Sequence, residues 1–185
     1  MIIGDTGVGK TSLMNRYLFN KFDEEQMPSM GAQSKPHLVT VPNEGQIKLT
    51  IWDTAGQEKF RSLTRMYFQD AEAAIIVYDT TFRDSFEGAR RWIDELRANA
   101  NIQDPVVALV GNKSDLASAM QVSFEEAHNL QSETKLDFVK ETSAKAEDNN
   151  GVQELFVDIA RRLIKKHKAK TVSRLICDSK LNIGR

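Results

Sequence analysis

The chain has 185 residues, of which 41% are hydrophobic and 28% are charged, a balance typical of one soluble globular domain. Its single cysteine, Cys177, excludes an internal disulfide framework and suits a reducing compartment. No apolar run is long enough to span a bilayer, and we expect no signal peptide because the first residues already belong to a glycine-rich motif.

The net charge of −1 conceals an uneven distribution. Residues 161–185 hold nine basic side chains and one acidic one, whereas residues 1–160 hold 16 basic and 25 acidic side chains. The acidic body argues against nucleic-acid binding, and we expect no nucleic-acid partner. The basic tail could be attracted to an anionic membrane surface, at about 1 kcal/mol per basic residue. A solvated helix end whose basic residues complement the helix dipole explains the same charges.

The first motif in the chain is rich in glycine. Residues 4–11 read GDTGVGKT and match G-x-x-x-x-G-K-[ST], the phosphate-binding loop. Residues 1–3 are apolar and indicate the end of a strand, while the spacing of Leu13, Tyr17 and Leu18 predicts a helix after the motif. This strand–loop–helix context favours the phosphate loop over the alternative, a glycine-rich turn ahead of an ordinary helix.

The chemistry of this loop suits a polyphosphate. Glycines let backbone amides approach phosphates closely, and the free amides and dipole at the start of a helix favour an anion. Lys10 can reach the β- and γ-phosphates, and the Thr11 hydroxyl can ligate Mg²⁺. The motif indicates a nucleoside triphosphate without specifying the base. The residues of this segment expected to bind it are Asp5, Thr6, Gly7, Val8, Gly9, Lys10, Thr11 and Ser12.

After the first helix, residues 22–33 read as a long polar surface loop, a kind of loop that is often functional. Strands at 38–41 and 47–52 follow, joined as a hairpin by the turn at 42–45. Prolines bracket the first of these strands, so we place it at the edge of the sheet.

The rest of the chain alternates between strands and helices. The capping-box pattern Ser123-Phe124-Glu125-Glu126 opens one of the helices. Strands are predicted at 73–78, 106–110 and 137–140, and helices at 85–98, 123–132 and from 150 to about 167.

This alternation predicts an α/β fold of the P-loop NTPase type. We expect a mostly parallel six-stranded sheet with one antiparallel edge strand and with helices on both faces. Ligands of such sheets bind at the carboxyl ends of the strands, and every polar motif of this chain follows a strand. We expect one domain over residues 1–167 and a basic tail over residues 168–185 that is frayed or disordered.

The motif DTAGQ at residues 53–57 follows the strand at 47–52. The Asp53 carboxylate can hold the Mg²⁺ that bridges the β- and γ-phosphates. Gly56 offers an amide to the γ-phosphate, and the side-chain amide of Gln57 can orient the attacking water. A D-x-x-G motif alone is often a simple turn, but its position downstream of a phosphate loop favours the catalytic interpretation. Gln57 and Lys10 are therefore the predicted catalytic residues.

The string NKSD at residues 112–115 indicates which base is bound. Guanine presents two adjacent donors that the Asp115 carboxylate can accept, whereas adenine would leave this carboxylate unpaired. Sites of this kind discriminate by about 10⁴–10⁵. Asn112 would contact the other edge of the base and tie loops together, and the stem of Lys113 would stack on the base plane.

A second loop, SAK at residues 143–145, follows the last predicted strand. The backbone amide of Ala144 is placed to donate to guanine O6. The residues of this loop that we expect to bind the base are Ser143, Ala144 and Lys145.

These motifs together resemble those of the Ras superfamily of small GTPases. The superfamily strings are GDTGVGKT, WDTAGQE, GNKSD and ETSAK, and KLTIW, KFRSLT, YFQDA and VYDTT resemble segments of the Rab branch. The resemblance covers residues 1–167. It implies a switch in membrane traffic that binds GTP and GDP with Mg²⁺. Such a switch hydrolyses GTP slowly alone and faster with a GTPase-activating protein.

The resemblance also implies roles for individual residues. Phe22 would pack against the guanine, and Ser29 stands where the family has a threonine that ligates Mg²⁺. The metal ligands would then be Thr11, Ser29 and Asp53. Exchange factors, GTPase-activating proteins and effectors would bind through Ser29–Ser34 and Gly56–Tyr67. We expect a monomer in the cytoplasm, peripheral on the cytosolic face of an internal membrane.

The chain departs from the Rab pattern in several places. The first strand is short, which suggests a truncated start, and Gln33-Ser34 replaces an acidic-aromatic pair. Trp52 and Tyr67 match two members of an aromatic effector triad whose third member is absent. Cys177 lies too far from the end for prenylation of the C-a-a-X kind.

Two other functions are compatible with parts of the sequence. The altered loop at 22–33 would suit a non-cycling, GTP-bound scaffold. An ATP-using small kinase would share the phosphate loop, but the NKSD string and the absence of a second-substrate domain disfavour it.

Overall fold

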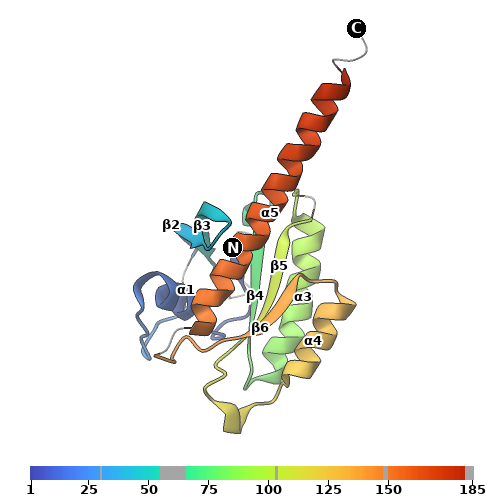
Figure 1. Cartoon of the computed structure of the whole chain (residues 1–185). Coiled ribbons are helices and arrows are strands. Elements are labelled where there is room, and N and C mark those ends of the chain that lie inside the picture. The colour runs from blue at the N-terminus through green and yellow to red at the C-terminus, as the bar shows by residue number, and fades with distance from the viewer. Residues whose placement is uncertain (30, 55–65, 103, 148–149, 182–185) are drawn as a thin grey trace.

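The computed structural model describes residues 1–29, 31–54, 66–102, 104–147 and 150–181. Its strands are β1 (Ile2–Ile3), β2 (Gln33–Val41), β3 (Gly45–Asp53), β4 (Ala73–Asp79), β5 (Val106–Asn112) and β6 (Phe138–Glu141). Its helices are α1 (Lys10–Phe19), α3 (Arg83–Asn99), the short 3₁₀ helix η2 (Ala117–Ala119), α4 (Phe124–Glu133) and α5 (Asn150–Leu181). Figure 1 shows their arrangement.

The six strands form one sheet in the order β2-β3-β1-β4-β5-β6. β2 pairs with β3 antiparallel, and the other neighbours are parallel, which confirms the predicted sheet and its antiparallel edge strand. Ile2 is paired with both Asp53 and Ile75, and Asp79 with Asn112. These registers bring the carboxyl ends of β1, β3, β4 and β5 to one edge, where the polar motifs follow.

Each face of the sheet carries its own hydrophobic cluster, because successive side chains of a strand point to opposite faces. On β4, Ile75 and Val77 pack with residues of α1 and α5, including Phe156. Ile76 and Tyr78 pack on the other face with residues of α3 and α4. The continuous apolar run predicted for this strand is therefore that of a strand buried on both faces.

Some element bounds differ from the predictions. β2 begins at Gln33, so Gln33-Ser34 belongs to the hairpin and not to the preceding loop. Pro36 lies within β2 opposite Thr50, which an edge strand tolerates because proline lacks only a hydrogen-bond donor. The capping box of α4 is confirmed, since Ser123 Oγ accepts from the Glu126 amide at 3.2 Å and the Glu126 carboxylate accepts from the Ser123 amide at 2.9 Å.

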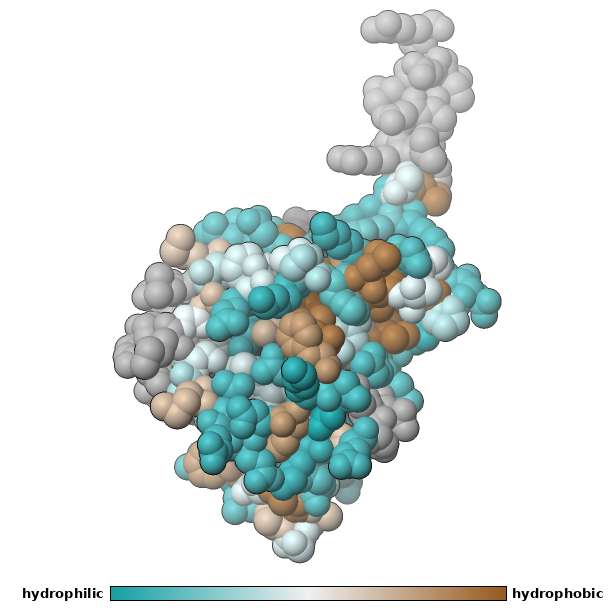
Figure 2. Space-filling view, turned by 90° about the vertical axis from the view of Figure 1, so that its left-hand side faces the viewer, coloured by the Kyte–Doolittle hydropathy of each residue, from teal (hydrophilic) through white to brown (hydrophobic). Residues whose placement is uncertain are grey.

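A surface cavity lies beside the short strand β1. It has a volume of about 370 Å³ and is bordered by β3, by the start of β4 and by α5, with Ile47, Leu49 and Leu163 among its apolar walls. In Figure 2, which faces the side of β2, β3 and α1, hydrophobic side chains reach the surface close to where α5 leaves the body.

The last helix is longer than the apolar pattern predicted. α5 runs to Leu181, through most of the segment that the sequence analysis assigned to a frayed tail, and its end projects from the body (Figure 1). Within the described residues, no helix has both the length and the apolar character needed to cross a bilayer.

Candidate nucleotide-binding site

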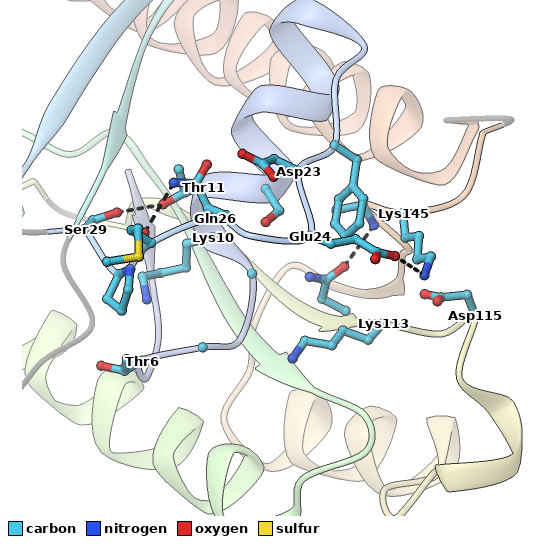
Figure 3. A pocket seen from close by; sticks show the side chains of 18 of the residues that line it. Thr6, Lys10, Thr11, Asp23, Glu24, Gln26, Ser29, Lys113, Asp115 and Lys145 are labelled. Atoms are coloured by element: carbon cyan, nitrogen blue, oxygen red, sulfur yellow. Dashed lines mark hydrogen bonds and ion pairs between the residues drawn. The ribbon is translucent and has the colours of Figure 1, made fainter.

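A cavity of about 360 Å³ opens at the carboxyl edge of the sheet (Figure 3). It is bordered by the phosphate loop, by the segment after α1 and by the loops that follow β5 and β6. The predicted site residues that line it are Thr6, Gly7, Gly9, Lys10, Thr11, Ser12, Phe22, Ser29, Asn112, Lys113, Asp115, Ala144 and Lys145. Asp5, Val8, Asp53 and Ser143 are not among the residues that line it. Gly56 and Gln57 fall outside the described residues.

The glycines of the phosphate loop adopt backbone conformations and close contacts that suit glycine. Gly4, Gly7 and Gly9 have φ values of 147°, 80° and 93°, in the region that glycine tolerates best. A β-carbon on Gly4 would lie 2.2 Å from the carbonyl oxygen of Val77, and one on Gly9 would lie 2.3 Å from Nδ2 of Asn112. The loop therefore packs tightly against the ends of β4 and β5.

The Lys10 ammonium is buried inside this loop. Its Nζ donates to the carbonyl oxygens of Gly4 at 2.9 Å and Asp5 at 2.8 Å. Burial lowers the pKa of Lys10 to about 8, although the charges of Asp53 and Asp5 oppose this effect. A desolvated cation at the start of a helix is a strong site for an anion.

The three predicted metal ligands lie together. Thr11 Oγ1 donates to Asp53 Oδ2 at 2.6 Å and lies 2.8 Å from Ser29 Oγ. The other carboxylate oxygen, Asp53 Oδ1, is buried without a hydrogen-bond partner in the described part of the chain. Burial raises the pKa of Asp53, and the bond from Thr11 and the charge of Lys10 oppose this shift. An oxygen-only donor set with one unpaired buried oxygen fits a hard cation such as Mg²⁺.

Asn112 connects three loops around the cavity. Its Nδ2 donates to the Val8 carbonyl at 2.9 Å, and its Oδ1 accepts from the backbone amide of Ala144 at 3.2 Å. This buried side chain therefore joins the phosphate loop to the loop after β6. The Ala144 amide, which we predicted to donate to guanine O6, donates to Asn112 in this structure.

Ser143 organises the base-binding loop from within. Its hydroxyl donates to Asp115 Oδ1 at 2.6 Å and accepts from the amides of Lys145 at 3.1 Å and Ala146 at 2.9 Å. One carboxylate oxygen of Asp115 is thereby oriented by Ser143. The serine acts here through Asp115 and the backbone rather than as part of the cavity wall.

Lys113 takes a backbone conformation with φ of 66° and directs its ammonium to a neighbouring strand. Its Nζ lies 2.6 Å from Oδ2 of Asp79, the last residue of β4. Burial would raise the pKa of Asp79, but bonds from Lys113 and Thr81 outweigh it and lower the pKa. Asp79 was not predicted as a site residue, and the predicted stacking of the Lys113 stem on the base stays a prediction.

Arg16 was also missed by the sequence analysis. It is buried in α1, and its Nε donates to the Ala144 carbonyl at 2.7 Å while Nη2 donates to the Lys145 carbonyl at 3.2 Å. Its position between the apolar residues Leu13 and Tyr17 could have indicated a buried arginine with a structural role, because a buried charge needs partners. At the mouth of the cavity, Lys145 pairs with Glu24 (Figure 3).

The predicted partner-binding surface is described only in part. Residues 55–65 fall outside the described residues. The rings of Trp52 and Tyr67, the two predicted members of the aromatic triad, lie with centroids 4.7 Å apart. Gln33-Ser34 extends this region along β2.

Comparison with known proteins identifies the family. The model of the Ras family matches residues 1–165. The chain is similar to the Ras-related protein RABF2b of Arabidopsis thaliana, with 46% identity over 88% of this chain and 79% of the relative. It is 43% identical to RABF2a of the same plant over 95% of this chain and 86% of the relative, and 42% identical to Rab5A of Oryza sativa subsp. japonica over 92% and 81%. The chain therefore belongs to the Ras family of small GTPases, with Rab5-type proteins among its relatives.

Proposed function

We propose that the cavity binds GTP and GDP together with Mg²⁺, and that the chain hydrolyses GTP as a regulator of vesicle traffic. The observation that supports this most directly is the joining of two predicted sites in one cavity. Lys10 and Thr11 of the phosphate loop, the latter bonded to Asp53 at the end of β3, line one part of the cavity, while Asp115, oriented by Ser143, borders the same cavity. A nucleoside polyphosphate has an anionic end and a base that match these two ends.

The chain's own residues would divide the chemistry between them. Lys10 and the amides of the phosphate loop would hold the β- and γ-phosphates and stabilise charge on the phosphoryl oxygens. Thr11, Ser29 and Asp53 would hold Mg²⁺, which neutralises charge on the phosphates when bound. Gln57 would orient the attacking water. We expect the activating protein to supply an arginine.

Guanine selection is the step that can be tested most sharply. We expect Asp115→Asn to lower affinity for GDP by about 10²-fold or more and to raise the relative affinity for xanthosine diphosphate. The Asp115 carboxylate complements the amine at position 2 of guanine, whereas an asparagine amide can donate to the carbonyl at position 2 of xanthine. Competition binding with GDP, xanthosine diphosphate and ADP measures this. Asp94→Asn, an exposed residue of α3, is the matched control. An unchanged preference for GDP in Asp115→Asn would contradict the proposed site.

Membership of the family supports the proposed cellular role. Exchange factors, GTPase-activating proteins and effectors would bind the surface around Ser29–Ser34 and Gly56–Tyr67, and the chain would act as a monomer. The basic residues of 161–185 would add attraction to the anionic cytosolic face of an internal membrane. Single-turnover GTP hydrolysis with and without a GTPase-activating protein separates this cycling switch from a scaffold that stays bound to GTP.

A further inference from the structure

Asp5 belongs to the phosphate loop, but its side chain contacts helix α3. Trp92 Nε1 donates to Asp5 Oδ1 at 2.8 Å, and Trp92 is 1% exposed. The Arg91 guanidinium lies 3.5 Å from Asp5 Oδ2, but its side chain is 57% exposed, so this ion pair contributes little. Of these two contacts, the tryptophan bond is therefore the stronger.

Gly88 makes room for this carboxylate. An added β-carbon at Gly88 would lie 2.0 Å from Asp5 Oδ2 and 2.8 Å from its Cγ. Because Oδ1 accepts from Trp92, moving the carboxylate away from an added β-carbon would strain or break that bond. A glycine inside a helix destabilises the helix by about 1 kcal/mol relative to alanine. Glycine at position 88 thus lowers the stability of α3 at the place where this helix contacts Asp5 of the phosphate loop.

The backbone of Asp5 carries this contact to the site. The carbonyl oxygens of Gly4 and Asp5 are the two acceptors of the buried Lys10 ammonium, at 2.9 and 2.8 Å. The position of these carbonyls fixes where Nζ lies. A shift of the Asp5 side chain would therefore move the acceptors of Lys10.

We propose that Asp5 is a positioning residue for Lys10, held by Trp92 and Gly88 of α3, so that α3 sets how tightly the loop binds the β-phosphate. This inference rests on the proposed function. In this proposal, the contact between α3 and Asp5 affects nucleotide affinity independently of the loops that bind the base. Substitutions on α3 then change phosphate binding without touching the nucleotide.

Gly88→Ala tests this coupling, because it displaces the Asp5 carboxylate while improving the helix. We expect GDP to dissociate about five- to tenfold faster, a typical size for coupling between sites. Thermal stability should fall only slightly, because the gain in helix propensity offsets part of the loss of the Trp92–Asp5 bond. Affinity for GMP should stay at the wild-type value, since Lys10 reaches the β- and γ-phosphates and GMP has neither. The ratio of GDP to GMP affinity therefore falls.

Two further variants make the test specific. Glu87→Ala, on the exposed side of the same helix turn, is the matched control and should behave as wild type. Trp92→Phe removes the donor and keeps an aromatic ring, and it should lower the same ratio. A wild-type ratio in Gly88→Ala would overturn the inference while leaving the proposed function intact. A wild-type chain that binds no guanine nucleotide would overturn the proposed function itself, and the inference with it.

Discussion

Replacing Arg16 with methionine measures how firmly α1 holds the base-binding loop. The guanidinium donates to the carbonyl oxygens of Ala144 and Lys145, at 2.7 and 3.2 Å, from a side chain that is 6% exposed. It also donates to the carbonyl of Asn20 at 3.2 Å and to its side chain at 3.0 Å. Methionine keeps the apolar stem and removes every one of these donors.

The loss can be estimated from these contacts. A hydrogen bond from a charged donor contributes about 1.5–3 kcal/mol, and a buried carbonyl left unpaired costs about 1–3 kcal/mol. The bond to Ala144 is buried and should dominate, because water can replace the partly buried bonds to Lys145 and Asn20. We expect the free energy of unfolding to fall by about 2–4 kcal/mol. GDP should also dissociate faster, since the released loop borders the cavity.

Denaturant unfolding at a fixed, saturating concentration of Mg²⁺ and GDP provides the measurement. Arg90→Met is the matched control, because Arg90 is 45% exposed and its ion pairs with Glu87 and Glu133 are on the surface. That variant should stay within about 0.5 kcal/mol of wild type. If Arg16→Met matched Arg90→Met in both stability and GDP dissociation, the proposed support of the loop by α1 would be refuted.

Two more predictions concern the phosphate end of the site. Gln57→Leu should bind GTP like wild type but lose most of the hydrolysis stimulated by a GTPase-activating protein; wild-type stimulated turnover would exclude Gln57 from orienting the water. The pKa of Lys10 is lowered to about 8, so the free protein loses this proton as the pH rises past 8, while bound phosphates keep Lys10 charged. The dissociation constant of GDP, measured by titration between pH 7 and pH 9.5, should therefore rise by up to about tenfold per pH unit above 8, and a flat profile would contradict the role of this ammonium.

Local chemistry explains why most of the fold could be predicted. Gly4 and Gly9 mark places where a β-carbon would collide with β4 and β5, so the loop motif carries its own conformation. Ser123 and Glu126 cap a helix through contacts within four residues, and the prolines flagged β2 as an edge strand. Each of these signals is contained in a few neighbouring residues.

The residues that were missed act through distant partners. Arg16 binds carbonyls 128 and 129 positions away, and Trp92 binds Asp5 across 87 positions. Asp79 pairs with Lys113 only because the register of β4 and β5 aligns the ends of both strands. Backbone carbonyls accept both of these bonds from Arg16, and a carbonyl leaves no signal in a sequence. Such supports require the three-dimensional structure.

The unpaired oxygen of Asp53 makes the stability of the folded chain depend on a bound ligand. Without a bound cation, the folded chain keeps a desolvated acceptor that water would satisfy in the unfolded chain, at a cost of about 1–3 kcal/mol. A ligand that satisfies it and binds only the folded chain adds about 4 kcal/mol of stability at a thousand times its dissociation constant. Under the proposed function, the Mg²⁺–nucleotide complex would serve as a structural component as well as a signal, and an empty molecule during exchange would be the form most exposed to proteases and chaperones.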